Sequence, residues 1–234
     1  MTNIQENIDA VLQRIAKACN KAQRKPQEVT LLAVTKTVPP ELIKSAIDAG
    51  QRHFGENYVN EGVEKITNMQ SETKAFGLVW HCIGPVQSNK TRLVAEHFDW
   101  VHSIDRLKIA QRLSDQRPLE AKLLQVCIQV NIDGGVNKSG VAPEDVLALA
   151  NELVKLPRLK LRGIMSIPEP AIDFEAAQVV NMRVRAVFDD LNRQGLGLDT
   201  LSLGMSADLE PAIAAGSTMV RVGTAIFGAR AQRG

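Results

Sequence analysis

The sequence predicts an α/β fold in the form of a single (β/α)8 TIM-type barrel with an extra N-terminal helix. Eight short apolar segments alternate with helical patterns along the chain, and nothing between them has the signature of an antiparallel hairpin. A length of 234 residues suits one such barrel. An open doubly wound sheet is the alternative, but no Gly-x-Gly-x-x-Gly follows the first predicted strand. Because no linker or repeat interrupts the pattern, we expect residues 1–234 to form one domain.

The individual elements follow from local residue patterns. The first helix has an apolar stripe at helical spacing, formed by Ile4, Ile8, Val11, Leu12, Ile15 and Ala16. The predicted strands are 29–36, 53–55, 79–83, 100–103, 123–131, 159–165, 200–203 and 219–222. The clearest helices between them are 40–49, 104–113, 143–156, 171–191 and 207–215.

Composition excludes several classes of protein. A formal net charge of +2 is too small to indicate binding to nucleic acid or to an anionic membrane. No apolar run approaches the length of a membrane span, and the polar N-terminus does not resemble a signal peptide. The three cysteines lack metal-type spacing and are odd in number, so we expect a reduced, cytoplasmic protein. His81 is expected to be a hydrogen-bonded core residue, and the scattered His53, His97 and His102 suggest no metal site.

Lys36 is the first candidate functional residue. It ends the apolar run 30–36 and precedes two prolines that stop the strand and start a helix. Barrel enzymes place their ligands at the carboxyl ends of the strands, where this amine would lie. The alternative is a structural lysine whose head extends from a strand end into solvent.

Two turns after the seventh and eighth predicted strands form a candidate phosphate site. The first is Ser202-Leu203-Gly204-Met205-Ser206 and the second is Gly223-Thr224-Ala225, and each leads into a helix. Glycine and hydroxyl residues there can expose backbone N–H groups to an anion, and barrels frequently bind phosphate at this corner. Ordinary strand-to-helix turns would have a similar composition.

Arg221 is the third candidate. If Val220 and Val222 face the surrounding helices, strand alternation directs Arg221 into the barrel. A buried guanidinium requires partners, which could be an internal ion pair, backbone carbonyls, or a ring nitrogen or anion of a ligand.

An amine, a phosphate corner and an interior arginine together suggest pyridoxal 5′-phosphate. The lysine would form a Schiff base with its aldehyde, and a protein group would face its pyridine nitrogen. Arginine stays charged in proteins, so it would leave that nitrogen unprotonated and the ring a poorer electron sink.

At these residues the chain resembles the pyridoxal phosphate homeostasis proteins, which share the barrel of the N-terminal domain of alanine racemase. The resemblance covers nearly the whole chain, with Thr35 and Val86 as slight departures from residues commoner in the family. The matching segments are 31–37 (LLAVTKT), 54–59 (FGENYV), 81–90 (HCIGPVQSNK), 138–140 (KSG), 163–165 (GIM), 201–206 (LSLGMS), 216–223 (GSTMVRVG) and 226–228 (IFG).

The resemblance implies a role for each candidate. Lys36 would be the Schiff-base lysine, Arg221 would approach the pyridine nitrogen, and Lys138 would be a possible secondary acceptor of the aldehyde. The family resemblance places phosphate contacts at the two turns, the ring hydroxyl near Asn57 and Met165 beside the ring. The complete implied cofactor-binding set is Lys36, Asn57, Met165, Ser202, Met205, Ser206, Arg221, Gly223 and Thr224.

The same resemblance implies a carrier or buffer of the cofactor in vitamin B6 homeostasis, without committed catalysis, which could supply apo-enzymes that need pyridoxal phosphate. The related racemases use a tyrosine from a separate C-terminal domain of the partner subunit, whereas the one tyrosine here is Tyr58. Lack of this tyrosine on the opposite face argues against efficient racemisation. Because the chain ends soon after the eighth predicted strand, the racemase-type dimer contact made through that domain is lost, and we expect a monomer. The alternatives are a fold-type III enzyme with weak racemase, decarboxylase or lyase activity, and a cofactor-free Schiff-base aldolase.

Overall fold

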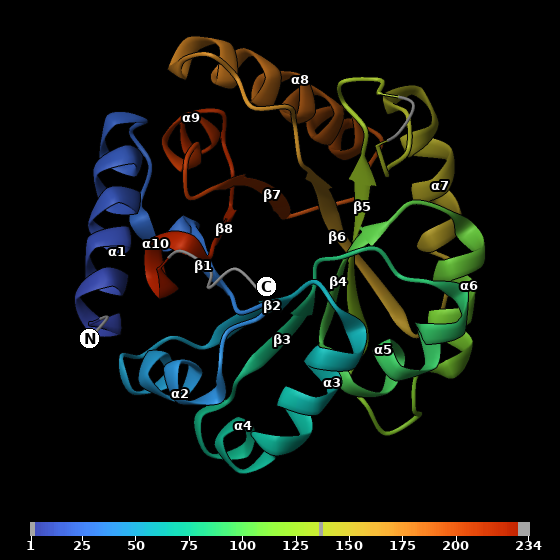
Figure 1. Cartoon of the computed structure of the whole chain (residues 1–234). Coiled ribbons are helices and arrows are strands. Elements are labelled where there is room, and N and C mark those ends of the chain that lie inside the picture. The colour runs from blue at the N-terminus through green and yellow to red at the C-terminus, as the bar shows by residue number, and fades with distance from the viewer. Residues whose placement is uncertain (1–2, 136–137, 229–234) are drawn as a thin grey trace.

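All eight predicted strands are present, and they close into a barrel. The computed structural model describes residues 3–135 and 138–228. Each strand pairs in parallel with the next along the chain, and β8 pairs with β1. The strands are β1 (Thr30–Val34), β2 (His53–Glu56), β3 (Val79–Cys82), β4 (Trp100–Ile104), β5 (Leu124–Val130), β6 (Leu159–Ser166), β7 (Thr200–Met205) and β8 (Met219–Val222) (Figure 1). The predicted (β/α)8 barrel is therefore confirmed.

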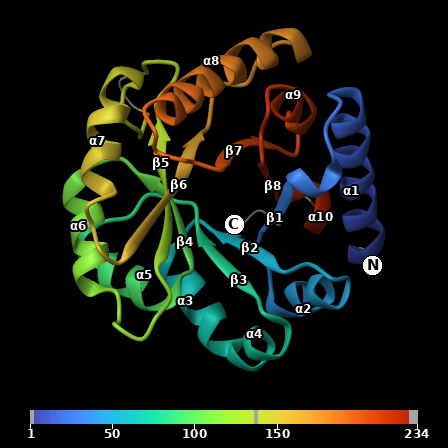
Figure 2. The same cartoon turned by 180° about the vertical axis from the view of Figure 1, so that it is seen from behind.

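Helices follow the strands around the outside of the barrel (Figures 1 and 2). They are α1 (Ile4–Lys21), α2 (Pro40–Asp48), α3 (Val59–Asn68), α4 (Gln70–Phe76), α5 (Thr91–His97), α6 (Leu107–Gln116), α7 (Val146–Leu153), α8 (Phe174–Arg193), α9 (Leu209–Ala214) and α10 (Thr224–Phe227). Short 3₁₀ turns lie at Pro26–Glu28, Ser88–Lys90 and Pro143–Asp145. Within the part of the chain that the structure describes, no helix is long and apolar enough to cross a membrane.

Some predicted element ends are wrong, each for a local reason. The first strand ends at Val34, because Lys36 lies in a turn. The helix predicted from residue 104 begins at Leu107, because Ile104 still belongs to β4. The helix predicted from residue 171 begins at Phe174, because the Asp173 carboxylate accepts the Ala176 N–H at 2.8 Å and caps the helix there.

The extra helix α1 stands beside α9 and α10 in both views (Figures 1 and 2). Ile4, Ile8, Val11 and Ile15 of its predicted apolar stripe are buried in the main core, whereas Leu12 is exposed. The Asn7 amide donates to the Ile226 carbonyl at 2.7 Å, and Arg14 forms an ion pair with Glu210 at 2.7 Å. The helix therefore supports the two segments that follow β7 and β8.

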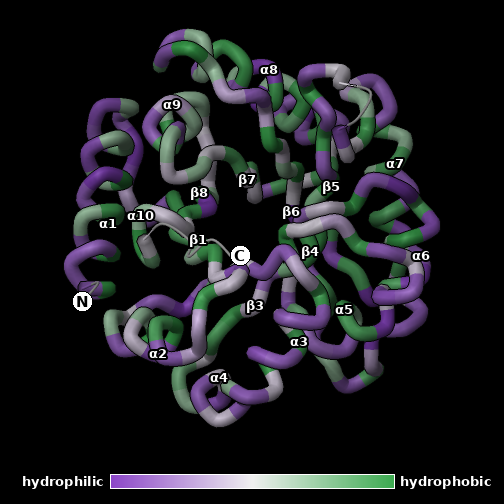
Figure 3. Tube along the Cα trace, in the orientation of Figure 1, coloured by the Kyte–Doolittle hydropathy of each residue, from purple (hydrophilic) through white to green (hydrophobic). Residues whose placement is uncertain are grey.

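Strand side chains alternate between the helices and the barrel interior. Val220 and Val222 of β8 belong to the core that packs against the helices, so Arg221 faces inward as predicted. Separate small clusters fill the interior. One contains Leu32, Ile83 and Met219, and the other contains Trp100, Cys127 and Met165. In Figure 3 hydrophobic and polar residues alternate along the turns of α1, as expected of a helix with one face against the rest of the fold.

Three histidines also occupy the interior, where barrels usually place branched apolar side chains. His53 Nδ1 lies 3.0 Å from His81 Nε2, and His81 Nδ1 lies 2.9 Å from His102 Nε2. His81 and His102 are fully buried. The expectation that His53 and His102 are scattered is therefore wrong, because parallel pairing of β2, β3 and β4 brings them together with His81.

These histidines are neutral at pH 7. Burial lowers the pKa of His102 from 6.5 to about 3 and lowers the pKa of His81 well below its usual range. The pKa of His53 is also lowered by burial.

We expect the free energy of unfolding to fall as the pH is lowered from about 7.5 to about 5. In this range the unfolded chain protonates His81 and His102 and the folded chain does not, so acid favours unfolding. His102 alone accounts for a loss of about 2 kcal/mol. Urea denaturation across the range measures the loss. Over the same pH range, His102→Asn should lose less free energy of unfolding than the wild type. Identical pH dependence in both proteins would contradict the conclusion that His102 is neutral in the folded chain.

Candidate functional site

Lys36 lies half-buried in the turn that follows β1, at the carboxyl end of the barrel strands. The Thr35 N–H donates to the Gly55 carbonyl at 2.9 Å and so extends the ladder between β1 and β2 to the edge of this turn. Thr37 has a φ of 61°, in the left-handed region that residues other than glycine seldom adopt. A backbone conformation of this kind persists only where surrounding contacts hold it.

A buried network of charges supplies those contacts. The Lys65 ammonium of α3 donates to the Thr35 carbonyl at 2.5 Å and pairs with Glu56 at 2.9 Å and Glu61 at 2.6 Å. The Thr35 hydroxyl donates to the Glu56 carboxylate at 2.6 Å, and the Thr37 N–H donates to Glu61 at 2.5 Å. Both residues that flank Lys36 are thus fixed to one network, which we call the Lys65 clamp.

The clamp is costly to disrupt because the Glu56–Lys65 pair at its centre is removed from water. Glu56 is fully buried, and 7% of Lys65 is exposed. Burial raises the pKa of Glu56, while the Lys65 ammonium and the Thr35 hydroxyl act in the opposite direction. From the sequence, Glu56 was recognisable only as a strand-end residue, and Lys65 was not predicted. The spacing of Glu61 and Lys65, four residues apart on a helix face, was the available signal.

Asn57 follows β2 and is positioned by close backbone packing. A Cβ atom on Gly84, in the loop after β3, would lie 2.1 Å from the Asn57 carbonyl oxygen, so only glycine fits there. The Ser103 hydroxyl of β4 donates to the Gly84 carbonyl at 2.6 Å and holds this loop in place. The Asn57 Oδ1 atom is buried and has no hydrogen-bond partner among the described residues. A ligand hydroxyl at this position would provide one.

The Arg221 guanidinium lies in the barrel interior, where three hydrogen bonds to protein acceptors hold it. It donates to the Ser202 carbonyl at 2.7 Å, to the Ser202 hydroxyl at 2.8 Å and to the Ser166 carbonyl at 2.9 Å. Burial lowers its pKa to about 10, so the guanidinium remains charged at pH 7. Its Nε has no hydrogen-bond partner among the described residues and can donate to a ligand.

The two turns of the candidate phosphate site differ in how their N–H groups are used. Gly223 and Thr224 begin α10, and their backbone N–H groups donate to no other residue within the described ranges. A Cβ on Gly223 would lie 3.2 Å from the Val34 carbonyl oxygen. This turn therefore lies against the end of β1, and Val34 is two residues before Lys36. Unused N–H groups at a helix start suit an anion.

In the other turn, the Met205 N–H donates to the Asp208 carboxylate at 2.7 Å and is not available to a ligand. The Met205 side chain is 40% exposed. The Ser206 carbonyl accepts from Arg14 of α1 at 3.0 Å, which leaves the Ser206 side chain half-buried at the corner. Met165 is fully buried in the interior beside Trp100.

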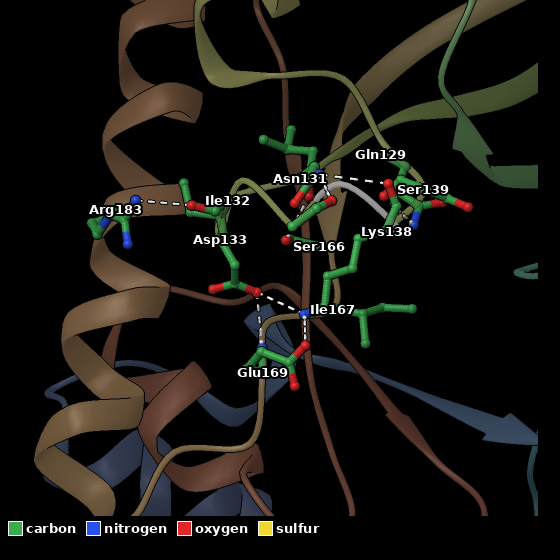
Figure 4. Close-up of polar contacts among 12 residues, drawn as sticks. Gln129, Asn131, Ile132, Asp133, Lys138, Ser139, Ser166, Ile167, Glu169 and Arg183 are labelled. Carbon is green, nitrogen blue, oxygen red and sulfur yellow. Dashed lines mark hydrogen bonds and ion pairs between the residues drawn. The ribbon is translucent and has the colours of Figure 1, made fainter.

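Lys138, the possible secondary acceptor, is tied to two carboxylates (Figure 4). Its ammonium lies 2.7 Å from Asp133 and 2.9 Å from Glu169. Burial acts to lower the pKa of Lys138, but these carboxylates outweigh it and the pKa is raised. Because only an unprotonated amine attacks an aldehyde, this environment does not favour Lys138 as the first acceptor. No group of three or more His, Cys, Asp or Glu side chains among the described residues could hold a metal.

We expect Lys65→Met to lower the free energy of unfolding by about 3–5 kcal/mol, because it leaves the Glu56 carboxylate buried without a cation. Urea denaturation measures the change. Lys44→Met is the matched control: Lys44 is largely exposed, pairs with Glu72 at 3.3 Å on the surface, and should cost less than about 1 kcal/mol. Similar losses for the two variants would show that the clamp has no special role.

Comparison with known proteins identifies the family. The family profile described as "Alanine racemase, N-terminal domain" matches residues 7–231. A protein of Escherichia coli strain K12 named "Pyridoxal phosphate homeostasis protein" is 54% identical over 230 residues, which are 98% of each chain.

Solved structures agree with this assignment. PipY of Synechococcus elongatus, in a structure described as having PLP bound, superposes with a TM-score of 0.77 at 36% identity and covers 93% of this chain and 100% of its own. Alanine racemase of Clostridium difficile shares the fold alone, with a TM-score of 0.75 at 16% identity over 97% of this chain and 57% of the racemase. The chain therefore belongs to the pyridoxal phosphate homeostasis protein family, whose barrel is that of the alanine racemase N-terminal domain.

Proposed function

We propose that this protein binds pyridoxal 5′-phosphate and carries or buffers it in vitamin B6 homeostasis, with the aldehyde held as a Schiff base on Lys36. The observation that carries the proposal is that one site contains both features: the Lys65 clamp fixes the turn that carries Lys36, and the inward Arg221 keeps its Nε available as a donor. The relative with PLP bound, at 36% identity over 93% of this chain, supports it.

The described residues fit the chemical groups of this cofactor. Arg221 offers its unused Nε to the pyridine nitrogen, and Ser202 acts on the cofactor through Arg221. Asn57 offers its unpartnered Oδ1 atom as an acceptor for the ring hydroxyl. Ser206, Gly223 and Thr224 would receive the phosphate through hydroxyl and backbone N–H groups, and Met165 and Met205 would supply apolar contacts to the ring and its surroundings.

The same residues restrict what the bound cofactor does. Pyridoxal phosphate supplies an aldehyde for an amine and a ring that can withdraw electrons from a substrate carbon. A permanently charged arginine at the pyridine nitrogen would be a donor only, so it would favour an unprotonated nitrogen and a ring that withdraws electrons weakly. This arrangement suits reversible holding of the cofactor better than carbanion chemistry.

The side chains available for acid–base catalysis also favour a carrier over the alternative of a weak racemase, decarboxylase or lyase. Racemisation requires acid–base groups on both faces of the substrate carbon. Tyr58 precedes α3 and is 59% exposed, away from the interior. Burial raises the pKa of both Cys82 and Cys127 to about 12, and the interior histidines are neutral and hydrogen-bonded to one another.

We also propose that the protein is a cytoplasmic monomer and that it delivers the cofactor to apo-enzymes that need it. Three buried, free cysteines are consistent with a reducing compartment.

We expect the wild-type protein mixed with pyridoxal phosphate to show a near-visible absorbance band that is absent in Lys36→Ala. Lys138→Ala, the matched lysine variant, should keep the band, because the Asp133 and Glu169 carboxylates hold Lys138 protonated. Absorbance after removal of free cofactor measures both, and circular dichroism confirms folding. Loss of the band in Lys138→Ala alone would contradict the lysine assignment. A wild-type protein that never gains a band would instead support the cofactor-free aldolase alternative.

A further inference from the structure

Arg221 is one end of a continuous chain of hydrogen bonds that crosses the barrel interior. Arg221 of β8 contacts the Ser202 hydroxyl of β7 at 2.8 Å, and that hydroxyl lies 3.1 Å from His102 Nδ1 of β4. His102 Nε2 lies 2.9 Å from His81 Nδ1 of β3, and His81 Nε2 lies 3.0 Å from His53 Nδ1 of β2. Strands β8, β7, β4, β3 and β2 thus contribute to one series of polar side chains.

This series is shielded from water and packed against an aromatic ring. Ser202, His81 and His102 are fully buried, and only His53 at the far end is partly exposed. The Trp100 ring stacks on His81 with centroids 5.2 Å apart and an interplanar angle of 18°. Because water is excluded, each nitrogen of His81 and His102 must find its hydrogen-bond partner within the series.

The charge on Arg221 fixes the direction of every bond. A guanidinium donates only, so the Ser202 oxygen accepts from it. The Ser202 hydroxyl has one proton to donate, and His102 Nδ1 is its partner among the described residues. His102 must then carry its proton on Nε2 and donate to His81 Nδ1, and His81 must do the same toward His53.

We propose that Ser202, His102, His81 and His53 form a one-way relay of neutral donors that positions the Arg221 guanidinium. Reversal of the three imidazoles would direct an N–H of His102 at Ser202 and leave the Ser202 hydroxyl proton without an acceptor in a dry interior. The relay therefore has one favoured arrangement of its protons. In that arrangement the Ser202 oxygen is held as the acceptor for Arg221. The three histidines are positioning residues. Where it concerns the cofactor, this inference rests on the proposed function.

Nitrogen-15 NMR of the imidazole rings tests the relay in the protein without cofactor. The shifts distinguish a ring protonated at Nε2 from one protonated at Nδ1 or at both nitrogens. We expect His53, His81 and His102 all to be neutral and protonated at Nε2 at pH 7. His97, which lies on α5 outside the series, is assigned with His97→Gln. A proton on Nδ1 of His102, or a charged ring at His81 or His102, would overturn the proposal.

A pair of substitutions tests the link to Arg221. His102→Asn keeps an acceptor near the position of Nδ1 and should preserve the bond to Ser202, whereas His102→Leu keeps volume and removes the acceptor. With pyridoxal phosphate as the probe, His102→Leu should raise the dissociation constant by about tenfold or more and shift the band, while His102→Asn stays within about threefold of the wild type.

These outcomes separate the relay from the proposed function. If the wild-type protein binds no cofactor, the proposed function fails, and the NMR result alone decides the relay. If the wild type binds cofactor and His102→Asn and His102→Leu have equal dissociation constants and bands, the histidine has only a packing role and the relay is wrong. Should His102→Leu fail to fold, the protonation states measured by NMR on the wild type still support or overturn the relay.

Discussion

The Lys65 clamp is the interaction on which the candidate site depends. One buried ammonium pairs with two carboxylates and also donates to the Thr35 carbonyl, so the turn that carries Lys36 is fixed on both sides. A flexible lysine at a strand end would reach in many directions. Here the Glu61 carboxylate accepts from the Thr37 N–H and so holds the positive φ with which the chain leaves this turn.

The opposite part of the site depends on hydrogen bonding, without a carboxylate in direct contact with the cation among the described residues. No salt bridge to Arg221 occurs among the described residues, and its bonds go to two carbonyls and a hydroxyl. Those partners stabilise the cation while leaving it available as a donor. A carboxylate partner would have neutralised it and occupied its N–H groups. The interior therefore presents a fixed positive donor to a ligand, within walls of neutral histidine, methionine and tryptophan.

The fold was predictable because each strand has its own local pattern and parallel pairing places consecutive strands side by side. The inward direction of Arg221 followed from its two valine neighbours. The clamp was not predictable in the same way, since Lys65 reaches Thr35 across 30 positions of sequence and helix α3 itself was not among the clearest helical patterns. The histidine series begins with a contact between Ser202 and His102, which lie 100 positions apart in the sequence, and only closure of the barrel brings them together.

The central claim is that the site holds pyridoxal phosphate for release. Transfer of bound cofactor to another protein tests this claim most directly. The loaded protein, freed of unbound cofactor, is mixed with the apo form of a pyridoxal phosphate enzyme, and activation of that enzyme is compared with release into buffer. The same loaded protein is incubated with a panel of amino acids. We predict that the apo-enzyme becomes active and that no amino acid is consumed in a Lys36-dependent way. Retention of the cofactor together with robust Lys36-dependent turnover would contradict this claim.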